Sequence, residues 1–185
     1  MNTANKLTLL RVFLVPIFMA LLLMDGTIFK VGALVIFIIA SITDALDGDI
    51  ARSRNQITTF GKFVDPLADK VLTTAAFMCF LVMDVYNPIS GLIAIMIILT
   101  REFTVSGVRL LAVGEGNVIA ASIWGKAKTV SQMLAIVVAL CFIAFCPDAT
   151  FVPMVNEILL WITVVLTIVS GTEYIIQNRK IIKLK

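Results

Sequence analysis

The chain has 185 residues, of which 60% are hydrophobic and 15% are charged, and its mean hydropathy is +1.04. Soluble domains carry about a quarter charged residues, so this composition excludes an ordinary soluble domain and is typical of an integral membrane protein. Histidine is absent, so a general base must be a carboxylate, lysine, tyrosine or cysteine. So short and apolar a chain predicts one membrane domain over residues 1–185.

Six apolar stretches predict membrane-spanning helices, because a bilayer requires about 20 mostly apolar residues per helix. They cover approximately residues 5–24, 30–52, 62–84, 88–110, 127–146 and 156–178. Turn-forming sequences separate several of them: DGT at 25–27, NP at 87–88, GEGN at 114–117 and CPD at 146–148. The first stretch resembles a signal peptide, but no clear cleavage site follows it, and we interpret it as a retained helix. The expected fold class is all-α, a bundle of six transmembrane helices.

Lysine and arginine are distributed unevenly over these six helices. If both termini lie in the cytoplasm, fourteen of the fifteen basic residues fall at cytoplasmic ends, and only Lys30 falls at an outer end. An odd number of spans would scatter these charges over both faces. The pattern therefore predicts a multi-pass protein of the cell membrane with cytoplasmic termini. The basic tail NRKIIKLK is interpreted as an anchor to lipid headgroups.

The three cysteines, Cys79, Cys141 and Cys146, lie in apolar stretches without the spacing of a metal site. We expect them to be small buried hydrophobic side chains rather than ligands or disulfide partners.

Aspartates are concentrated in residues 44–69, DALDGDIARSRNQITTFGKFVDPLAD, between two apolar stretches. Asp44 and Asp47 are three residues apart and Asp65 and Asp69 are four apart, so each pair shares one face of a helix. Four carboxylates that converge at a membrane boundary would repel each other and therefore require cations. An all-oxygen donor set favours Mg²⁺ or Mn²⁺ over zinc. The stretch predicts two divalent cations, about 3.5–4 Å apart, that bind phosphate oxygens.

The residues between the two aspartate pairs favour the same interpretation. Gly48, Ala51 and Gly61 lack bulk, which allows a backbone or a flat ring to approach closely. Arg52 has the planar donor geometry that suits phosphate. Asp49 lies off both aspartate faces and is interpreted as a solvated side chain, as an isolated D-x-x-D pair at a helix end would be.

The pattern Asp44-x-x-Asp47-Gly48-x-x-Ala51-Arg52, followed after eight residues by Gly61-x-x-x-Asp65-x-x-x-Asp69, resembles the signature of the CDP-alcohol phosphatidyltransferases at every defined position. The resemblance implies six transmembrane helices, a polar cavity facing the cytoplasm, and two divalent ions held by the four aspartates. It also implies transfer of a phosphatidyl group from CDP-diacylglycerol to an alcohol with release of CMP, within phospholipid biosynthesis, and a homodimer.

Individual roles follow from the same resemblance. Asp44, Asp47 and Asp65 are expected to be metal ligands, and Asp69 is expected to be both a ligand and the general base for the acceptor hydroxyl. The CDP-diacylglycerol-binding residues are expected to be Gly48, Ala51, Arg52, Gly61, Thr8 and Arg11. Arg11, with Thr8 and Asn5, is expected either to line the entrance for the lipid substrate or to serve as an interfacial anchor.

The acceptor is not defined by the signature. The segments TTFGKFVDPLADK, REFTVSGVR, WGKAKT and SGTEY resemble the bacterial branch of the family whose acceptor is glycerol 3-phosphate. A small dianion requires cations, and the candidates are Arg101, Arg109, Lys126 and Lys128, with Glu102 orienting Arg101. These cations could instead be anchors at anionic headgroups, and serine or inositol phosphate are alternative acceptors.

Two other functions are compatible with aspartates in an apolar chain. An intramembrane prenyltransferase also binds Mg²⁺-diphosphate, but its two motifs usually lie in separate halves of a longer chain. A small cation transporter would have carboxylates near the middle of the membrane, whereas these aspartates lie at one boundary.

Overall fold

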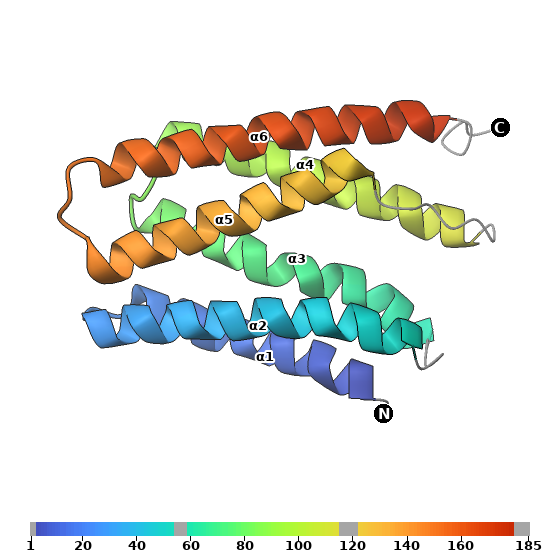
Figure 1. Ribbon diagram of the computed structural model, residues 1–185, viewed down its shortest axis with the longest axis horizontal. Helices are drawn as coiled ribbons and strands as arrows, with labels where there is room; N and C mark the ends of the chain where they lie inside the picture. Colours follow the sequence, from blue (N-terminus) through green and yellow to red (C-terminus); the bar gives the residue numbers. More distant parts are fainter. Residues whose placement is uncertain (1–2, 54–58, 115–121, 180–185) are drawn as a thin grey trace. The chain divides into compact units, whose positions relative to one another are not determined.

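The computed structural model describes the backbone of residues 3–53, 59–114 and 122–179, and the side chains of residues 9–43, 70–112, 114 and 122–179. These residues form six α-helices and no strand (Figure 1). The helices are α1 (Thr3–Leu23), α2 (Thr27–Ser53), α3 (Thr59–Val82), α4 (Pro88–Gly114), α5 (Ile123–Phe145) and α6 (Val152–Gln177). The all-α prediction is confirmed, and the largest boundary difference is four residues, at the end of α4 and at the starts of α5 and α6.

Three helices have the length and composition that crossing a membrane requires. They are Pro88–Ala112, Ile123–Phe145 and Val152–Gln177, with mean hydropathies of 1.6, 2.0 and 2.0. The described apolar parts of α1, α2 and α3 are shorter, at Leu9–Leu23, Thr27–Thr43 and Lys70–Val82. The composition of the second half of the chain therefore supports a membrane protein, and the count of six spans stays a prediction.

The chain divides into two compact units. Unit 1 comprises Met1–Met83 and Ile136–Val152, and unit 2 comprises Asp84–Ala135 and Pro153–Lys185, so the division falls within α5. The single membrane domain expected from the sequence stays a prediction. Each unit is described below by itself.

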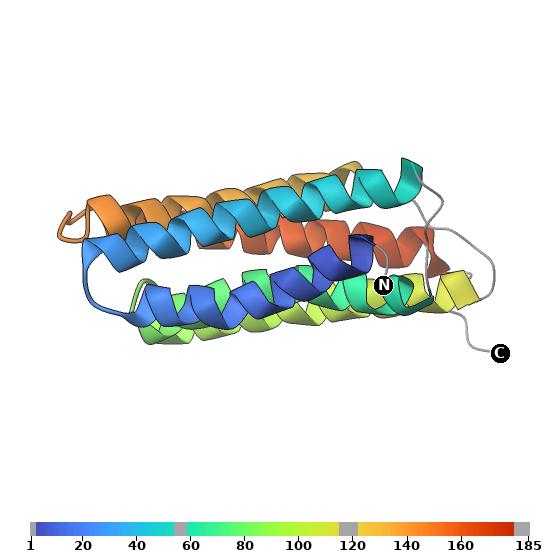
Figure 2. The same cartoon turned by 90° about the horizontal axis from the view of Figure 1, so that it is seen from below.

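In unit 1, α1 packs against both α2 and α3 (Figure 2). Its buried side chains Val15, Phe18 and Leu22 recur every three to four residues, which places them on one face of the helix. The Phe18 ring contacts Phe37 of α2 in a tilted arrangement with ring centroids 5.8 Å apart. Apolar burial of this kind accounts for the packing of the three helices.

The turn between α1 and α2 provides a hydrogen-bond partner for Lys30, the one basic residue that the charge pattern places at an outer end. Gly26 has a φ of 115°, a conformation that glycine adopts without strain. The turn brings Lys30 back to α1, where its Nζ donates a hydrogen bond to the carbonyl oxygen of Leu22. A cation at a helix C-terminus satisfies a carbonyl without an intrahelical partner and complements the helix dipole.

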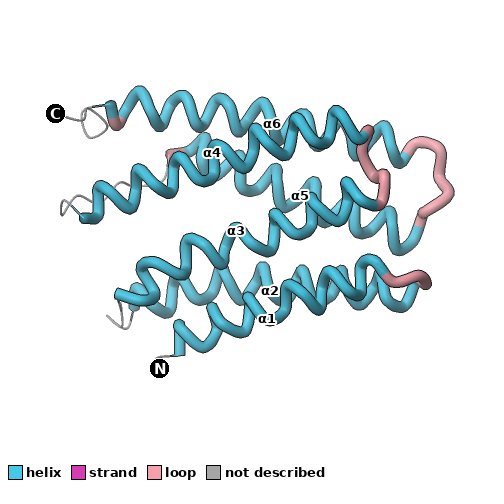
Figure 3. The backbone as a smooth tube through the Cα atoms, turned by 180° about the vertical axis from the view of Figure 1, so that it is seen from behind, coloured by secondary structure: helices cyan, strands magenta, loops and turns pink. Residues whose placement is uncertain are grey.

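In unit 2, side-chain caps define where two helices begin. Asn87 Oδ1 accepts hydrogen bonds from the backbone N–H groups of Ile89 and Ser90, at 3.1 and 3.2 Å, and proline occupies the first position of α4. Ser122 Oγ accepts from the N–H of Gly125 at 3.1 Å and caps α5 in the same way. The described loops between helices are short (Figure 3).

Glu157 joins the N-terminal parts of α4 and α6. Its carboxylate accepts hydrogen bonds from the Asn87 N–H and the Trp161 indole N–H, both at 3.3 Å, and from the Ser90 hydroxyl. Because these residues lie in the N-terminal parts of the two helices, α4 and α6 start on the same side and run parallel. Burial raises the pKa of Tyr86 in the preceding turn, and the Glu157 carboxylate raises it further, so the phenol stays protonated at neutral pH.

The cysteine prediction is confirmed for Cys79, which is buried, and is wrong for Cys146, which is exposed. α5 ends at Phe145, so Cys146 lies in the following turn, outside the apolar packing of the helix. Cys141 is partly exposed.

We expect Glu157→Gln to lower the free energy of unfolding by about 1–2 kcal/mol, because the amide keeps the size of the side chain but loses the charge that faces three donors. Thermal unfolding of the purified protein in detergent measures the change. Asp148→Asn removes a carboxylate from an exposed turn and is the matched control. Equal unfolding temperatures for the two variants would contradict the role of Glu157.

Candidate functional site

One carboxylate in unit 2 binds two of the cations singled out in the sequence. Glu102 and Arg101 are neighbours on α4, and Lys128 lies on α5. Glu102 Oε1 accepts from Arg101 Nη1 at 3.2 Å and also from Lys128 Nζ. The exposed fraction of the side chain is 14% for Glu102, 15% for Arg101 and 3% for Lys128. We call Arg101, Glu102 and Lys128 the Glu102 cluster.

The Glu102 cluster has a formal charge of +1, because two cations share one carboxylate. An ammonium as buried as that of Lys128 requires a charged partner, since an unpaired buried charge is strongly unfavourable. Lys126, two residues earlier, lies on the opposite side of α5 and is exposed. The two lysines, separated by a single residue in the sequence, therefore occupy different environments.

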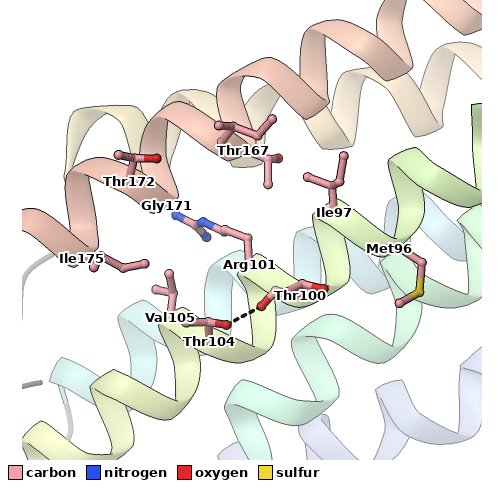
Figure 4. Close-up of a pocket in the computed structure, with 11 residues that line it drawn as sticks. Met96, Ile97, Thr100, Arg101, Thr104, Val105, Thr167, Gly171, Thr172 and Ile175 are labelled. Atoms are coloured by element: carbon pink, nitrogen blue, oxygen red, sulfur yellow. Dashed lines mark hydrogen bonds between the residues drawn. The ribbon is translucent and has the colours of Figure 1, made fainter. Parts of the chain in front are cut away.

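Arg101 also lies in a groove of about 400 Å³ between α4 and α6 (Figure 4). The walls are mostly apolar side chains and threonines, among them Met96, Ile97, Thr104, Val105, Ile168 and Thr172. The guanidinium of Arg101 extends from α4 toward α6, next to Gly171. Its Nε is buried and has no hydrogen-bond acceptor among the described residues. A cationic donor group thus lies within an otherwise apolar groove.

Arg109 lies two turns further along α4 than Arg101. Its guanidinium carbon is 5.6 Å from the ring centroid of Tyr174 on α6, a cation–π contact. Tyr174 is 3% exposed, and its hydroxyl has no hydrogen-bond partner among the described side chains and backbone. Arg109 itself is exposed, so its planar donors are accessible to a ligand.

The structure therefore groups the four predicted acceptor-binding cations unevenly. Arg101 and Lys128 meet at Glu102, Arg109 contacts Tyr174, and Lys126 is exposed at the start of α5. No contact among the described side chains joins all four in one cradle. The arrangement provides one pair of cations that share a carboxylate and two accessible cations.

The acidic stretch is described at the level of its helices. Asp44 and Asp47 lie in α2, and Asp65 and Asp69 lie in α3, so each pair is separated by about one helical turn. Their side chains lie outside the described residues. Elsewhere, the described side chains contain no group of three or more Cys, Asp or Glu residues that could hold a metal ion.

The predicted binding positions for the lipid substrate are described in part. Gly48, Ala51 and Arg52 belong to the end of α2, Gly61 to the start of α3, and Thr8 and Asn5 to α1, and their side chains also lie outside the described residues. Arg11 is 3% exposed. Such burial favours a position inside the protein over an anchor exposed to lipid headgroups.

Three features of unit 2 were not assigned a role from the sequence. The link between Glu102 and Lys128 joins residues 26 apart, and no local pattern predicts it. Gly171 and Tyr174 occur in the SGTEY segment. The resemblance singled out this segment but did not indicate which partner each residue contacts. Their partners, Arg101 and Arg109, lie on another helix and were identifiable only from the fold.

Residues 1–169 match the family model of the CDP-alcohol phosphatidyltransferases. Because the match covers most of the chain, the chain belongs to this family of membrane-associated transferases. Membership identifies the chain as an enzyme, and the prenyltransferase and cation-transporter interpretations are therefore set aside.

Relatives match over nearly the whole chain. A CDP-diacylglycerol–glycerol-3-phosphate 3-phosphatidyltransferase of Bacillus subtilis strain 168 is 39% identical over 98% of this chain and 97% of its own length. Proteins of the same name from Rickettsia typhi and Shigella flexneri serotype 5b are 38% and 35% identical, over 94% and 96% of this chain and 94% and 95% of their own lengths.

We expect Glu102→Gln to lower the free energy of unfolding by about 3 kcal/mol, because it removes the carboxylate to which the buried Lys128 donates. The measurement is thermal or denaturant unfolding in detergent. Glu173→Gln is the matched control, since Glu173 accepts a hydrogen bond from the Gln177 amide, which a glutamine can also accept. A Glu102→Gln variant as stable as the control would show that Glu102 does not neutralise Lys128.

Proposed function

We propose that the chain transfers the phosphatidyl group of CDP-diacylglycerol to glycerol 3-phosphate, which yields phosphatidylglycerophosphate and CMP. The chain would thus be a phosphatidylglycerophosphate synthase in the synthesis of phosphatidylglycerol and cardiolipin. The observation that carries the proposal is near-full-length similarity, at 35–39% identity, to relatives named for this reaction. The complete family signature between residues 44 and 69 supports the same reaction.

The chemistry requires a base and an electrophilic phosphorus. Asp69 removes the proton from the C1 hydroxyl of glycerol 3-phosphate, and the resulting oxyanion forms a bond to the β-phosphorus of CDP-diacylglycerol. The bond from that phosphorus to the bridging oxygen breaks, and CMP leaves with the oxygen and its electron pair. Asp69 then releases the proton to solvent. The absence of histidine from the chain is consistent with a carboxylate in this role.

The carboxylates of Asp44, Asp47, Asp65 and Asp69 would hold two divalent cations. The one-turn spacing within each pair and the all-oxygen donor set fit Mg²⁺ or Mn²⁺. Bound at these carboxylates, such ions would offset the charge of the diphosphate and of the departing CMP. Gly48, Ala51 and Gly61 would leave room for the cytidine, and Arg52 would bind a phosphate oxygen. Thr8 and Arg11 would contact the lipid substrate.

Recognition of glycerol 3-phosphate requires cations for its phosphate. Arg109 and Lys126 are exposed and would bind the phosphate directly. Arg101 would contribute through the donors that Glu102 leaves available, and Lys128 would add its positive charge. Zwitterionic serine would require fewer cations than the chain provides here.

The same proposal includes the setting of the enzyme. The chain would be a multi-pass protein of the bacterial cytoplasmic membrane with both termini in the cytoplasm and a polar cavity open to that side, and it would act as a homodimer. The excess of basic residues at the expected cytoplasmic ends supports the orientation.

A direct assay tests the acceptor. Purified protein is incubated with CDP-diacylglycerol, Mn²⁺ and labelled glycerol 3-phosphate, and in parallel with serine or inositol phosphate. We expect CMP and labelled phosphatidylglycerophosphate in the first reaction alone. Release of CMP with serine or inositol phosphate, and none with glycerol 3-phosphate, would overturn the acceptor assignment.

We expect Asp69→Asn to lower kcat at least about a hundredfold while part of the substrate binding survives, because the amide cannot accept the proton. Asp44→Ala should lose both turnover and metal-dependent binding. Asp49→Asn is the matched control, since Asp49 lies off both aspartate faces. Initial rates of CMP release measure kcat, and a near-normal rate for Asp69→Asn would exclude it as the base.

We expect Arg109→Ala to raise the KM for glycerol 3-phosphate about tenfold and to leave the KM for CDP-diacylglycerol within about twofold, because it removes a charged hydrogen-bond donor for phosphate. Arg179→Ala removes an exposed arginine near the end of the described chain and is the control. An equal rise in both KM values would argue against specific contact with the acceptor.

A further inference from the structure

We propose that Gly171 is a positioning residue for the acceptor site: the missing side chain at this position lets Arg101 lie against α6, where Glu102 holds it beside Lys128. The inference rests on the proposed function, since it concerns how the cations for glycerol 3-phosphate are arranged. All four residues belong to unit 2.

Gly171 of α6 lies directly against the side chain of Arg101. A Cβ built on Gly171 would lie 2.9 Å from Arg101 Cγ, 3.9 Å from its Cβ and 4.0 Å from its Nε. A separation of 2.9 Å between two carbon atoms is well inside van der Waals contact. Gly171 is buried, and Figure 4 shows the Arg101 side chain extending toward it from α4.

The position of this contact along the arginine decides its consequence. Cγ is the second carbon of the side chain, so Arg101 cannot avoid a new methyl group by moving only its guanidinium. Either χ1 must change, which carries Cγ and the guanidinium away, or α4 and α6 must separate. A change of χ1 would displace Nη1 from Glu102 Oε1, to which it donates a 3.2 Å hydrogen bond, and separation of the helices would remove the α6 backbone against which Arg101 lies.

The other end of Arg101 is also next to a glycine. A Cβ on Gly125, in the first turn of α5, would lie 3.8 Å from Arg101 Nη2, which is ordinary contact. Arg101 therefore passes between a glycine of α6 and a glycine of α5, and only the first of them is too close for a side chain. Glu102 and Lys128 complete the arrangement from α4 and α5.

The arrangement converts a flexible arginine into a defined donor. An arginine loses side-chain entropy when a ligand orders it, and an arginine held in place before the ligand binds avoids part of that loss. Contact with Gly171 and the shared carboxylate of Glu102 restrict Arg101 in this way. Its buried Nε, without an acceptor among the described residues, and its Nη2 keep donor capacity that Glu102 does not use.

The test is a double-mutant cycle of Gly171→Ala and Arg101→Ala. Gly171→Ala should raise the KM for glycerol 3-phosphate about tenfold, with the KM for CDP-diacylglycerol within about twofold of wild type. In the Arg101→Ala background, where the Cγ atom is absent, Gly171→Ala should change neither KM by more than about twofold. Gly107→Ala, at a glycine of α4 with no atom within 4 Å of the added Cβ, is the control and should behave as wild type.

Two results would overturn the proposal. One is a Gly171→Ala variant whose KM for glycerol 3-phosphate equals that of the Gly107→Ala control. The other is an effect of Gly171→Ala that is as large in the Arg101→Ala background as in wild type, since Gly171 would then act independently of Arg101. If Gly171→Ala does not fold, the double variant decides: recovery of folded protein supports the contact, and failure to recover contradicts it.

The same cycle measured by thermal unfolding needs no substrate. Non-additive unfolding temperatures would support the contact even if the wild-type enzyme used another alcohol, whereas additive ones would contradict it. A wild-type protein that released CMP only with a different acceptor would overturn the proposed function and leave this readout intact. The two failures are therefore distinguishable.

Discussion

The structure depends on one constraint: in a chain that is 60% hydrophobic, an ionised side chain that leaves water needs a partner of opposite charge or a backbone dipole. Lys128 donates a hydrogen bond to the carboxylate of Glu102, and Lys30 donates one to the carbonyl oxygen of Leu22 at the end of α1. Glu157 accepts hydrogen bonds from three donors near the N-terminal ends of α4 and α6. Each of these contacts joins two helices, so the polar groups that burial would penalise also define which helices are neighbours.

Within unit 2, α4 and α6 contact each other through different chemistry along their length. Glu157, Ser90 and Trp161 join their N-terminal parts, Arg101 packs against Gly171 further along, and Arg109 stacks on Tyr174 beyond that. In each contact, the partner on α6 lies 65 to 71 residues after the partner on α4, as expected for two parallel helices in a nearly constant register. Apolar packing alone specifies register weakly, and these polar contacts specify it along both helices.

The proposed chemistry separates two tasks between two kinds of residue. Carboxylate pairs, each one turn apart on α2 or α3, would bind the diphosphate through metal ions and accept the proton. Cations on α4 and α5 would bind the acceptor. The second task involves selectivity among small alcohols, which depends on how rigidly the cations are held. The Glu102 cluster supplies such rigidity at the expense of one positive charge, and Arg109 and Lys126 remain accessible.

Composition and pattern alone were sufficient for much of this description. Apolar runs of about 20 residues predicted six helices with ends within four residues of those observed, because helix length in a membrane protein is dictated by local composition. The cysteines show the limit of the same reasoning: Cys146 is the last residue of the apolar stretch 127–146, yet it is exposed in the turn beyond Phe145, where α5 ends.

By itself, the sequence determined the all-α class, the family through the spacing of four aspartates, and the set of candidate cations. These properties are local, since they depend on residues a few positions apart on one helix. The tertiary structure alone decided that Glu102 also binds Lys128, that Lys128 is buried whereas Lys126 is exposed, and that Gly171 and Tyr174 are the partners of two arginines. Such contacts join residues 26 to 70 positions apart, and helix packing, rather than any spacing in the chain, brings them together.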